Sequence, residues 1–233
     1  MRLDKFIAHA TGLSRADVKH RLKAGAIACN GLIERKGATH IALTDSVTLD
    51  GQTLQLPGPR YYMLHKPAGV VCANSDAEHP TVFDCLKDLD TRALQIAGRL
   101  DIDTTGLVLL TDDGQWNHRI TSPQHDKQKR YTVTTEDPLH ASLAERFAEG
   151  IALHGERHAC RPAELSVIDT HRAQLAISEG KYHQVKRMFA ACSHKVTALH
   201  RDAVAGIELD ENLQPGEYRA LTAEEIERGN QPQ

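Results

Sequence analysis

The chain has 233 residues, of which 40% are hydrophobic and 4% aromatic, and its formal net charge is −3. This length predicts one or two domains with mainly aliphatic cores. No apolar run is long enough to cross a membrane, and the N-terminal segment shows no secretory signal. The five cysteines form no CxxC pair, which argues against a zinc site or a disulfide framework. We therefore expect a protein of the reducing cytoplasm.

Charge is distributed unevenly along the chain. Residues 1–60 hold nine Lys/Arg and five Asp/Glu, a balance of +4, whereas residues 202–233 hold two Lys/Arg and eight Asp/Glu, a balance of −6. The local charge of a surface, rather than the net charge of the whole chain, decides whether that surface attracts a phosphate backbone. The basic N-terminal segment therefore keeps nucleic acid as a candidate partner.

Residues 1–56 are predicted to form a small unit of two helices and a twisted sheet. Apolar residues at helical spacing indicate a helix at the N-terminus. Ser14 can cap a second helix by accepting a backbone hydrogen bond, and Gly25 is suited to end it. Two hairpin turns follow, an Asn-Gly pair at 30–31 and an Asp-Gly pair at 50–51.

The second helix carries Arg15, Lys19 and Lys23 at four-residue intervals, which places three cations on one face. Such a stripe is often only a solvated helix face. Here Arg35 and Lys36 add positive charge after the helix, so a surface that follows a phosphate backbone is an equally strong interpretation. Both interpretations stay open on these residues alone.

A Pro-Gly-Pro sequence can continue neither a helix nor a central strand, so we predict a linker at 57–60 and a second domain at 61–233. Apolar runs and alternation predict strands there at 61–65, 70–72, 107–111, 129–135, 164–168 and 172–178. Helices are predicted at 81–90, 114–122 and 182–192, near Pro138, and after Thr222. This mixture indicates an α+β or mixed α/β domain.

Several well-known catalytic motifs are absent. The sequence has no GxxxxGK[ST] loop, no GxGxxG after a strand, and neither HExxH nor GxSxG. Its 14 histidines form no cluster with metal-ligand spacing. We therefore expect neither a cofactor nor a metal, and the candidate chemistry rests on a carboxylate-rich loop, a strand tyrosine and a basic helix.

Aspartates flank the apolar strand predicted at 107–111. Asp112 and Asp113 follow it and precede a helix, a pattern typical of turn and helix-cap residues. Asp101 and Asp103 precede it. Their pattern fits either a solvated turn or a carboxylate at the mouth of a cleft, and composition alone leaves both interpretations open.

Tyr131 shares a strand face with Val133, which by itself is most often a core position. Lys186 lies on a helix whose neighbour Val185 is predicted to face the core. A cation that points inward requires a counter-charge, because unpaired burial is unfavourable. A carboxylate from the Asp101 loop would satisfy it, and the pairing would hold that carboxylate ionised in an apolar site.

Five stretches, in this order, resemble pseudouridine synthases of the RsuA type over essentially the whole chain. The N-terminal MRLDKFIA…GLSRADVKHRLKAGAIACNG resembles an RNA-binding module shared with a small-subunit ribosomal protein. LHKPAG at 64–69 resembles the family's Lys-Pro-x-Gly motif. GRLDIDTTG at 98–106 resembles its central motif, KRYTV at 129–133 its tyrosine motif, and GKYHQVKRM at 180–188 its third motif.

The resemblance implies that Asp101 is the catalytic carboxylate, that Tyr131 stacks on the uracil, and that Lys186 pairs with Asp101. Val185 would line the pocket. Arg99 would fill the gap left by a flipped base or hold a phosphate, although an ordinary surface cation is an equally good interpretation. Some relatives have arginine at position 186, and lysine offers a point charge without the bidentate fork.

The implied fold is a mixed, mainly antiparallel sheet flanked by helices, preceded by the RNA-binding module, in which Arg15, Lys19 and Lys23 would contact RNA. The implied activity is isomerisation of uridine 516 of 16S ribosomal RNA by base flipping, without a cofactor or metal. The expected enzyme is a cytoplasmic monomer acting on a small-subunit assembly intermediate, with no membrane partner. Two alternatives stay open: a synthase for 23S ribosomal RNA, and a non-catalytic RNA-binding assembly factor.

Overall fold

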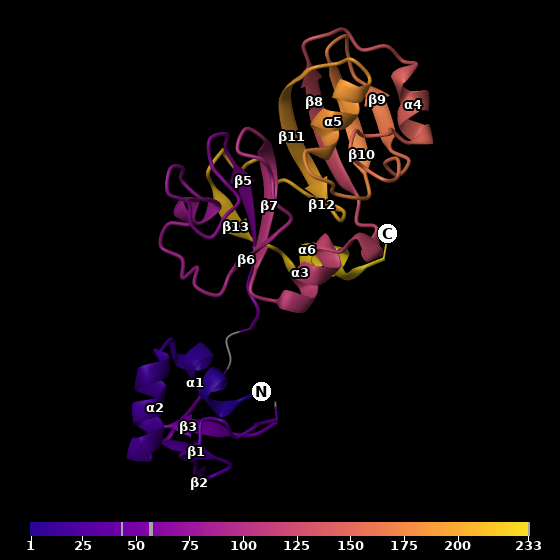
Figure 1. Cartoon of the computed structure of the whole chain (residues 1–233). Coiled ribbons are helices and arrows are strands. Elements are labelled where there is room, and N and C mark those ends of the chain that lie inside the picture. The colour runs from indigo at the N-terminus through magenta and orange to yellow at the C-terminus, as the bar shows by residue number, and fades with distance from the viewer. Residues whose placement is uncertain (43, 56–57, 233) are drawn as a thin grey trace. The chain divides into compact units, whose positions relative to one another are not determined.

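The structure is a computed structural model and describes residues 1–42, 44–55 and 58–232 (Figure 1). It divides into two compact units, Met1–Gly58 and Pro59–Gln233. This boundary falls within the segment 57–60 for which the sequence predicts a linker, although Pro57 itself lies outside the described residues. In the described part of the chain, no helix has the length and apolarity needed to cross a bilayer.

The N-terminal unit packs two helices against a four-stranded antiparallel sheet of order β2-β1-β3-β4. Its elements are α1 (Leu3–Thr11), α2 (Arg15–Ala24), β1 (Ile27–Cys29), β2 (Leu32–Ile33), β3 (Val47–Leu49) and β4 (Gln52–Thr53). Leu3, Ile7, Val18 and Ile27 are fully or almost fully buried between the helices and the sheet. The predicted helices and both predicted hairpins are therefore confirmed.

Local interactions explain where these elements begin and end. The Ser14 hydroxyl accepts a hydrogen bond from the backbone N–H of Asp17 and donates to its carboxylate. Gly25 ends α2 in the left-handed conformation, with φ of 76°. Both residues of each hairpin turn, at 30–31 and 50–51, have positive φ, as a type I′ turn requires.

The second unit is built on a nine-stranded sheet in which β13-β5-β7-β11-β8-β10-β9 are neighbours, with β6 also paired to β7 and β12 to β11. The strands are β5 (Tyr61–Lys66), β6 (Gln95–Ala97), β7 (Thr105–Thr111), β8 (Lys129–Thr135), β9 (Glu164–Val167), β10 (Arg172–Ile177), β11 (Val196–Val204), β12 (Ile207–Glu208) and β13 (Tyr218–Ala220). Only β7 and β11 pair in parallel among the described strands. The predicted mixed, mainly antiparallel sheet is thus confirmed.

Helices cover this sheet, with α5 beside β11 and α4 beside β9, whereas α3 and α6 pack together near β6 (Figure 1). They are α3 (Gly114–Thr121), α4 (Leu143–Glu149), α5 (Gln184–Ala191) and α6 (Ala223–Asn230), with 3₁₀ turns at Val82–Cys85 and Pro123–His125. The predicted capping box of α6 is confirmed: Thr222 and Glu225 each accept a backbone hydrogen bond from the other.

Three sequence predictions in this unit need correction. Residues 70–72 form no strand but a single bridge between Val71 and Thr81, because Pro80 has no N–H to extend the ladder. The helix predicted at 81–90 is only a short 3₁₀ turn. The helix predicted near Pro138 begins five residues later, at Leu143, and the segment before it is joined to the Thr170 carbonyl by the N–H of Leu139.

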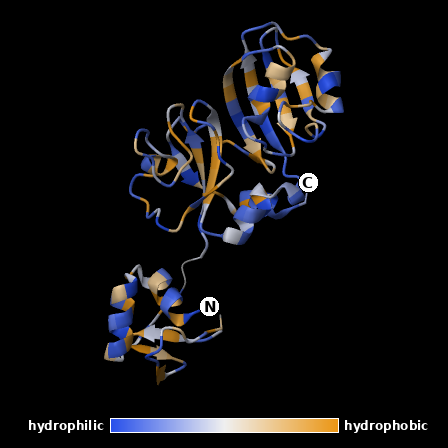
Figure 2. Ribbon diagram, viewed as in Figure 1, coloured by the Kyte–Doolittle hydropathy of each residue, from blue (hydrophilic) through white to orange (hydrophobic). Residues whose placement is uncertain are grey.

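The continuous apolar run of β7 is explained by burial on both faces. Leu107 and Leu109 face one hydrophobic core with Trp116, whereas Val108 and Leu110 face the other. Such double burial is typical of a central strand, and Figure 2 shows β7 as hydrophobic along its length. The rigid strand fixes the polar loop that enters it.

Candidate active site

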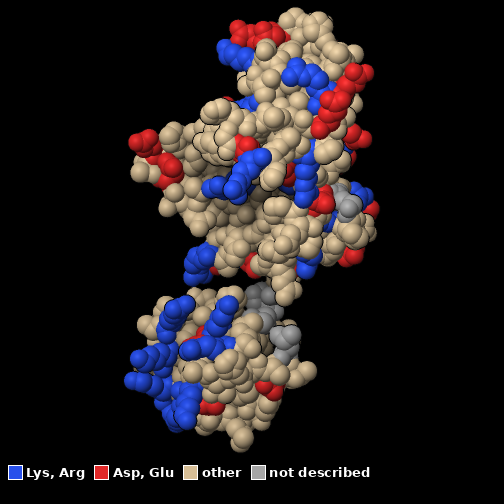
Figure 3. Space-filling view, turned by 45° about the vertical axis from the view of Figure 1, so that its right-hand side comes forward, with Lys and Arg blue, Asp and Glu red and all other residues tan. Residues whose placement is uncertain are grey.

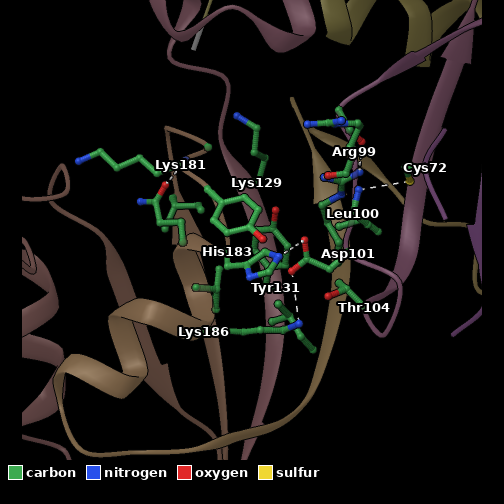
Figure 4. A pocket seen from close by; sticks show the side chains of 18 of the residues that line it. Cys72, Arg99, Leu100, Asp101, Thr104, Lys129, Tyr131, Lys181, His183 and Lys186 are labelled. Atoms are coloured by element: carbon green, nitrogen blue, oxygen red, sulfur yellow. Dashed lines mark hydrogen bonds and ion pairs between the residues drawn. The ribbon is translucent and has the colours of Figure 1, made fainter. Parts of the chain in front are cut away.

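A cavity of about 550 Å³ is lined by the loop that enters β7, by β8 and β11, and by the first turn of α5. All five residues that the sequence assigns to the catalytic pocket line it: Arg99, Asp101, Tyr131, Val185 and Lys186. The fold therefore gathers three separate sequence motifs around one hollow (Figure 4).

Asp101 lies in the loop between β6 and β7, with 30% of its side chain exposed. The N–H of Thr104 donates to the Asp101 carbonyl at 3.1 Å and closes a turn. Gly106 then enters β7 with φ of +104°, and a Cβ at this position would lie 2.3 Å from the Arg201 carbonyl oxygen. Only glycine permits this approach, which holds the loop against β11.

A buried ammonium group also anchors the loop that carries Asp101. Lys66, at the end of β5, is fully buried, and its Nζ donates to the carbonyls of Thr104 at 2.7 Å, Pro67 at 2.9 Å and Ile102 at 3.2 Å. Burial lowers the pKa of Lys66, and the carboxylates of Asp103 and Asp101 act in the opposite direction. Lys66 thus fixes the backbone on the C-terminal side of Asp101.

A buried guanidinium anchors the N-terminal side of the loop. Arg201 on β11 is 1% exposed, and its Nη2 donates to the Gly98 carbonyl at 2.7 Å, its Nη1 to Arg99 at 3.4 Å and its Nε to Leu107 at 2.8 Å. All three acceptors are backbone carbonyls. The Arg201 side chain therefore joins the start of the loop, at Gly98 and Arg99, to Leu107 in β7, the strand that follows the loop.

Two basic groups of the α5 segment meet the Asp101 carboxylate. His183 Nε2 lies 3.3 Å from Oδ1 and Lys186 Nζ lies 3.3 Å from Oδ2, as Figure 4 shows. Lys186 also binds Asp103, at the shorter distance of 2.6 Å. The hydrogen bond from Lys186 holds the pKa of Asp103 below its usual value. Desolvation opposes protonation of Lys186, but its contacts with Asp103 and Asp101 raise its pKa overall.

Tyr131 and Val185 provide an apolar wall. Tyr131 is 7% exposed and stands on β8 opposite Arg201 of β11 and Leu175 of β10. Val185, 4% exposed, approaches from α5. The wall faces the same cavity as the Asp101 carboxylate. The site therefore combines an ionisable carboxyl group with an apolar surface on which a planar ring can lie.

Sequence reasoning gave no role to three residues that shape this site. His183 precedes Lys186 by three residues, the spacing of neighbouring side chains on the helix predicted at 182–192, although in the structure His183 lies just before α5 with φ of 47°. Arg201 lies two residues after apolar Leu199 and so shares its strand face, which marks Arg201 as inward-facing. Nothing in the sequence shows that Lys66 would reach the carbonyls around Asp101, since that depends on the pairing of β5 with β7.

The cavity also contains Lys129, whose Nζ donates to the Lys127 carbonyl at 2.9 Å. Burial, with a smaller effect from Arg201, lowers its pKa to about 8. The ordinary value is 10.5, so between these values the unfolded chain binds a proton that the folded one does not. We therefore expect the free energy of unfolding of the wild type, measured relative to that of Lys129→Gln, to rise by about 2–3 kcal/mol between pH 8 and pH 10.5. Below pH 7 this difference should not change with pH. Urea unfolding of both proteins across this range measures it, and a constant difference would contradict it.

The N-terminal unit carries a separate groove of about 800 Å³ between α1, α2 and the segment at 35–38. Arg15, Lys19 and Lys23 line it, and Figure 3 shows Lys and Arg side chains gathered on this unit. Within the described residues none of the three forms an ion pair, whereas Arg21 pairs with Asp50 at 3.1 Å. The groove therefore carries an excess of positive charge, although Asp4, which also lines it, pairs with Arg2.

Comparison with known proteins decides the family. The model of the RNA pseudouridylate synthase family matches residues 60–191. The chain is 51% identical to the ribosomal small subunit pseudouridine synthase A of Yersinia pestis over 227 residues, which are 97% of either protein. It is 52% identical to the protein of that name from Escherichia coli K12, over 97% of this chain and 98% of the relative.

The chain belongs to the pseudouridine synthase family. A solved structure described as a pseudouridylate synthase is 46% identical, with a TM-score of 0.72, and covers 98% of this chain and 99% of that one. The resemblance inferred from the five sequence stretches is therefore confirmed, together with the fold class and the expectation of an RNA-modifying isomerase.

Proposed function

We propose that this pseudouridine synthase isomerises one uridine of small-subunit ribosomal RNA, uridine 516 of 16S RNA, in an assembly intermediate and as a cytoplasmic monomer. The observation that carries the proposal is the Asp101 carboxylate, held in a cavity between the Lys186 ammonium and the His183 imidazole and beside the buried Tyr131 ring. An acidic group in a surface that must accept a polyanion repels it, so its place there requires a chemical reason. The names of the two similar relatives from Yersinia pestis and Escherichia coli support the small-subunit substrate.

The reaction breaks the bond between N1 and C1′, turns the uracil, and joins C5 to C1′, while C5 loses a proton and N1 gains one. The target uridine must leave its stack to reach the cavity. Asp101 attacks C1′ or C6, or removes a sugar proton, and each route requires its ionised form. Tyr131 stacks on the uracil and assists removal of the C5 proton, and Val185 completes the apolar wall.

Lys186 balances the charge of Asp101, and Arg99, exposed at the entrance to the same loop, fills the gap left by the flipped base or binds a phosphate. In the N-terminal unit, Arg15, Lys19 and Lys23 bind the phosphate backbone through the excess positive charge of the groove. The N-terminal unit thus supplies affinity for RNA, and the second unit carries out the reaction.

Lys186→Met should lower the rate of pseudouridine formation about tenfold to a hundredfold, because it leaves Asp101 without its ammonium partner. Lys186→Arg keeps the charge and should retain most of the activity. Single-turnover rates with saturating enzyme measure both variants. Wild-type turnover by Lys186→Met would rule out a catalytic contribution from the ion pair.

Replacing Arg15, Lys19 and Lys23 together with glutamine should weaken RNA binding and reduce the slope of log affinity against log salt by about two. The slope counts the phosphates that the protein neutralises. Binding titrations at several salt concentrations give it directly. Arg21→Gln is the control on the same helix, because Arg21 is already paired with Asp50 and its loss should leave the slope unchanged.

Mapping pseudouridines in ribosomal RNA from a strain that lacks the gene tests the proposed function. One pseudouridine, at position 516 of the small-subunit RNA, should be missing and should return when the wild-type gene is restored. A loss confined to large-subunit RNA would replace the proposed target with a 23S site. Unchanged modification of both RNAs would favour the non-catalytic assembly factor.

A further inference from the structure

An aromatic ring at the edge of the catalytic cavity is left in solvent. Tyr182 lines the cavity and is 76% exposed. Single exposed apolar side chains are common and by themselves mean little. Within the described residues, however, its hydroxyl group has no hydrogen-bond partner, so neither core packing nor hydrogen bonding accounts for the position of this side chain.

The Tyr182 ring is nevertheless held in a defined orientation. It stacks on the His183 imidazole with ring centroids 3.8 Å apart and planes inclined by 19°. The Tyr182 carbonyl accepts a hydrogen bond from Arg187 Nη1 at 3.0 Å, and the N–H of Lys181 donates to Gln184 Oε1 at 2.8 Å. One ring face is therefore covered by a neighbour, while the exposure of the side chain leaves the other open.

The stacked pair of Tyr182 and His183 adjoins the reacting group through its imidazole. The imidazole beneath Tyr182 is the one whose Nε2 is 3.3 Å from Asp101. A planar base stacked on the open face of Tyr182 would lie about 3.5–4 Å from the Tyr182 ring, on the side opposite the imidazole. A nucleotide next to the one whose sugar faces Asp101 can reach this position.

We propose that Tyr182 is a stacking platform for the base of a nucleotide that adjoins the target uridine. The inference rests on the proposed function. Flipping the uridine removes a stacking neighbour from each adjoining base, and an aromatic side chain replaces that contact for any base, because every base has a π-face. Stacking uses the ring and not the hydroxyl, so phenylalanine should serve as well as tyrosine.

The test uses a synthetic RNA stem-loop that contains the mapped uridine, with either a base or an abasic sugar at each adjoining position. On intact RNA, Tyr182→Ala should lower kcat/KM about tenfold and Tyr182→Phe less than about twofold. An abasic sugar on one side should lower the wild-type value by a similar factor. On that RNA, Tyr182→Ala should cause no further loss.

A control variant and two contrary results make the test decisive. Ile168→Ala removes another exposed apolar side chain, outside the cavity and 54% exposed, and should change nothing. The inference is overturned if Tyr182→Ala matches the wild type on intact RNA, or if its loss is equally large on both abasic RNAs, as expected if Tyr182 only supports His183. Wild-type protein that converts no ribosomal RNA would instead overturn the proposed function, and the inference with it.

Discussion

Asp101→Asn is expected to lower the rate of pseudouridine formation by more than about a thousandfold. Asparagine keeps the size of the side chain but has no ionised oxygen, so it can act neither as a nucleophile nor as a base. His183 and Lys186 lie within 3.3 Å of the carboxylate and would still hold the amide in place. Single-turnover conversion of small-subunit ribosomal RNA, with RNA affinity measured in parallel, separates lost chemistry from lost binding.

Asp103→Asn provides the matched control. Asp103 is two residues away, carries the same charge and lies closer to Lys186, at 2.6 Å, but 67% of its side chain is exposed. Its replacement should reduce the rate less than about tenfold, because it alters the charge near the site without removing the reacting oxygen. Equal losses in the two variants would show that the loop acts through its summed charge, and more than a tenth of the wild-type rate in Asp101→Asn would remove Asp101 from the chemistry.

The helix ends and hairpins of the fold were predictable, because they depend on interactions between residues close in sequence. Ser14 marks the start of α2 and Gly25 its end, and each does so through a hydrogen bond with a residue of that helix. The order of strands in the large sheet was not accessible in the same way. The pairing of β7 with β11 joins segments about 95 residues apart and depends on a close approach at Gly106 that no local pattern reveals.

The candidate site divides along the same line. Asp101, Tyr131 and Lys186 were found through sequence motifs, and residue types alone left each with a structural interpretation. The contact between Lys186 and Asp103 was not expected, because loop geometry rather than spacing decides which carboxylate comes closer. Residues that act through the backbone, such as Lys66 and Arg201, carry no sequence signal of their targets, since any carbonyl can be an acceptor.

Lys66→Met should lower the free energy of unfolding by about 2–4 kcal/mol and kcat by about tenfold or more, with a smaller effect on KM. Methionine fills a similar volume, but the carbonyls of Pro67, Ile102 and Thr104 lose their shared donor in a buried site. The loss stays below the sum of three bonds, because removing a buried charge also removes its desolvation cost. Urea unfolding and steady-state kinetics measure the two effects.

The kinetic part of this prediction distinguishes positioning from simple stability. Domains of this size retain several kcal/mol after such a loss, so the variant stays folded at low temperature. If Lys66 fixes the backbone on which Asp101 is mounted, kcat remains low even where the protein is fully folded, because a small misplacement of the reacting oxygen is enough. Lys87→Met, at an exposed position of the same unit, should change neither quantity. Recovery of full kcat by folded Lys66→Met would leave Lys66 a purely stabilising role.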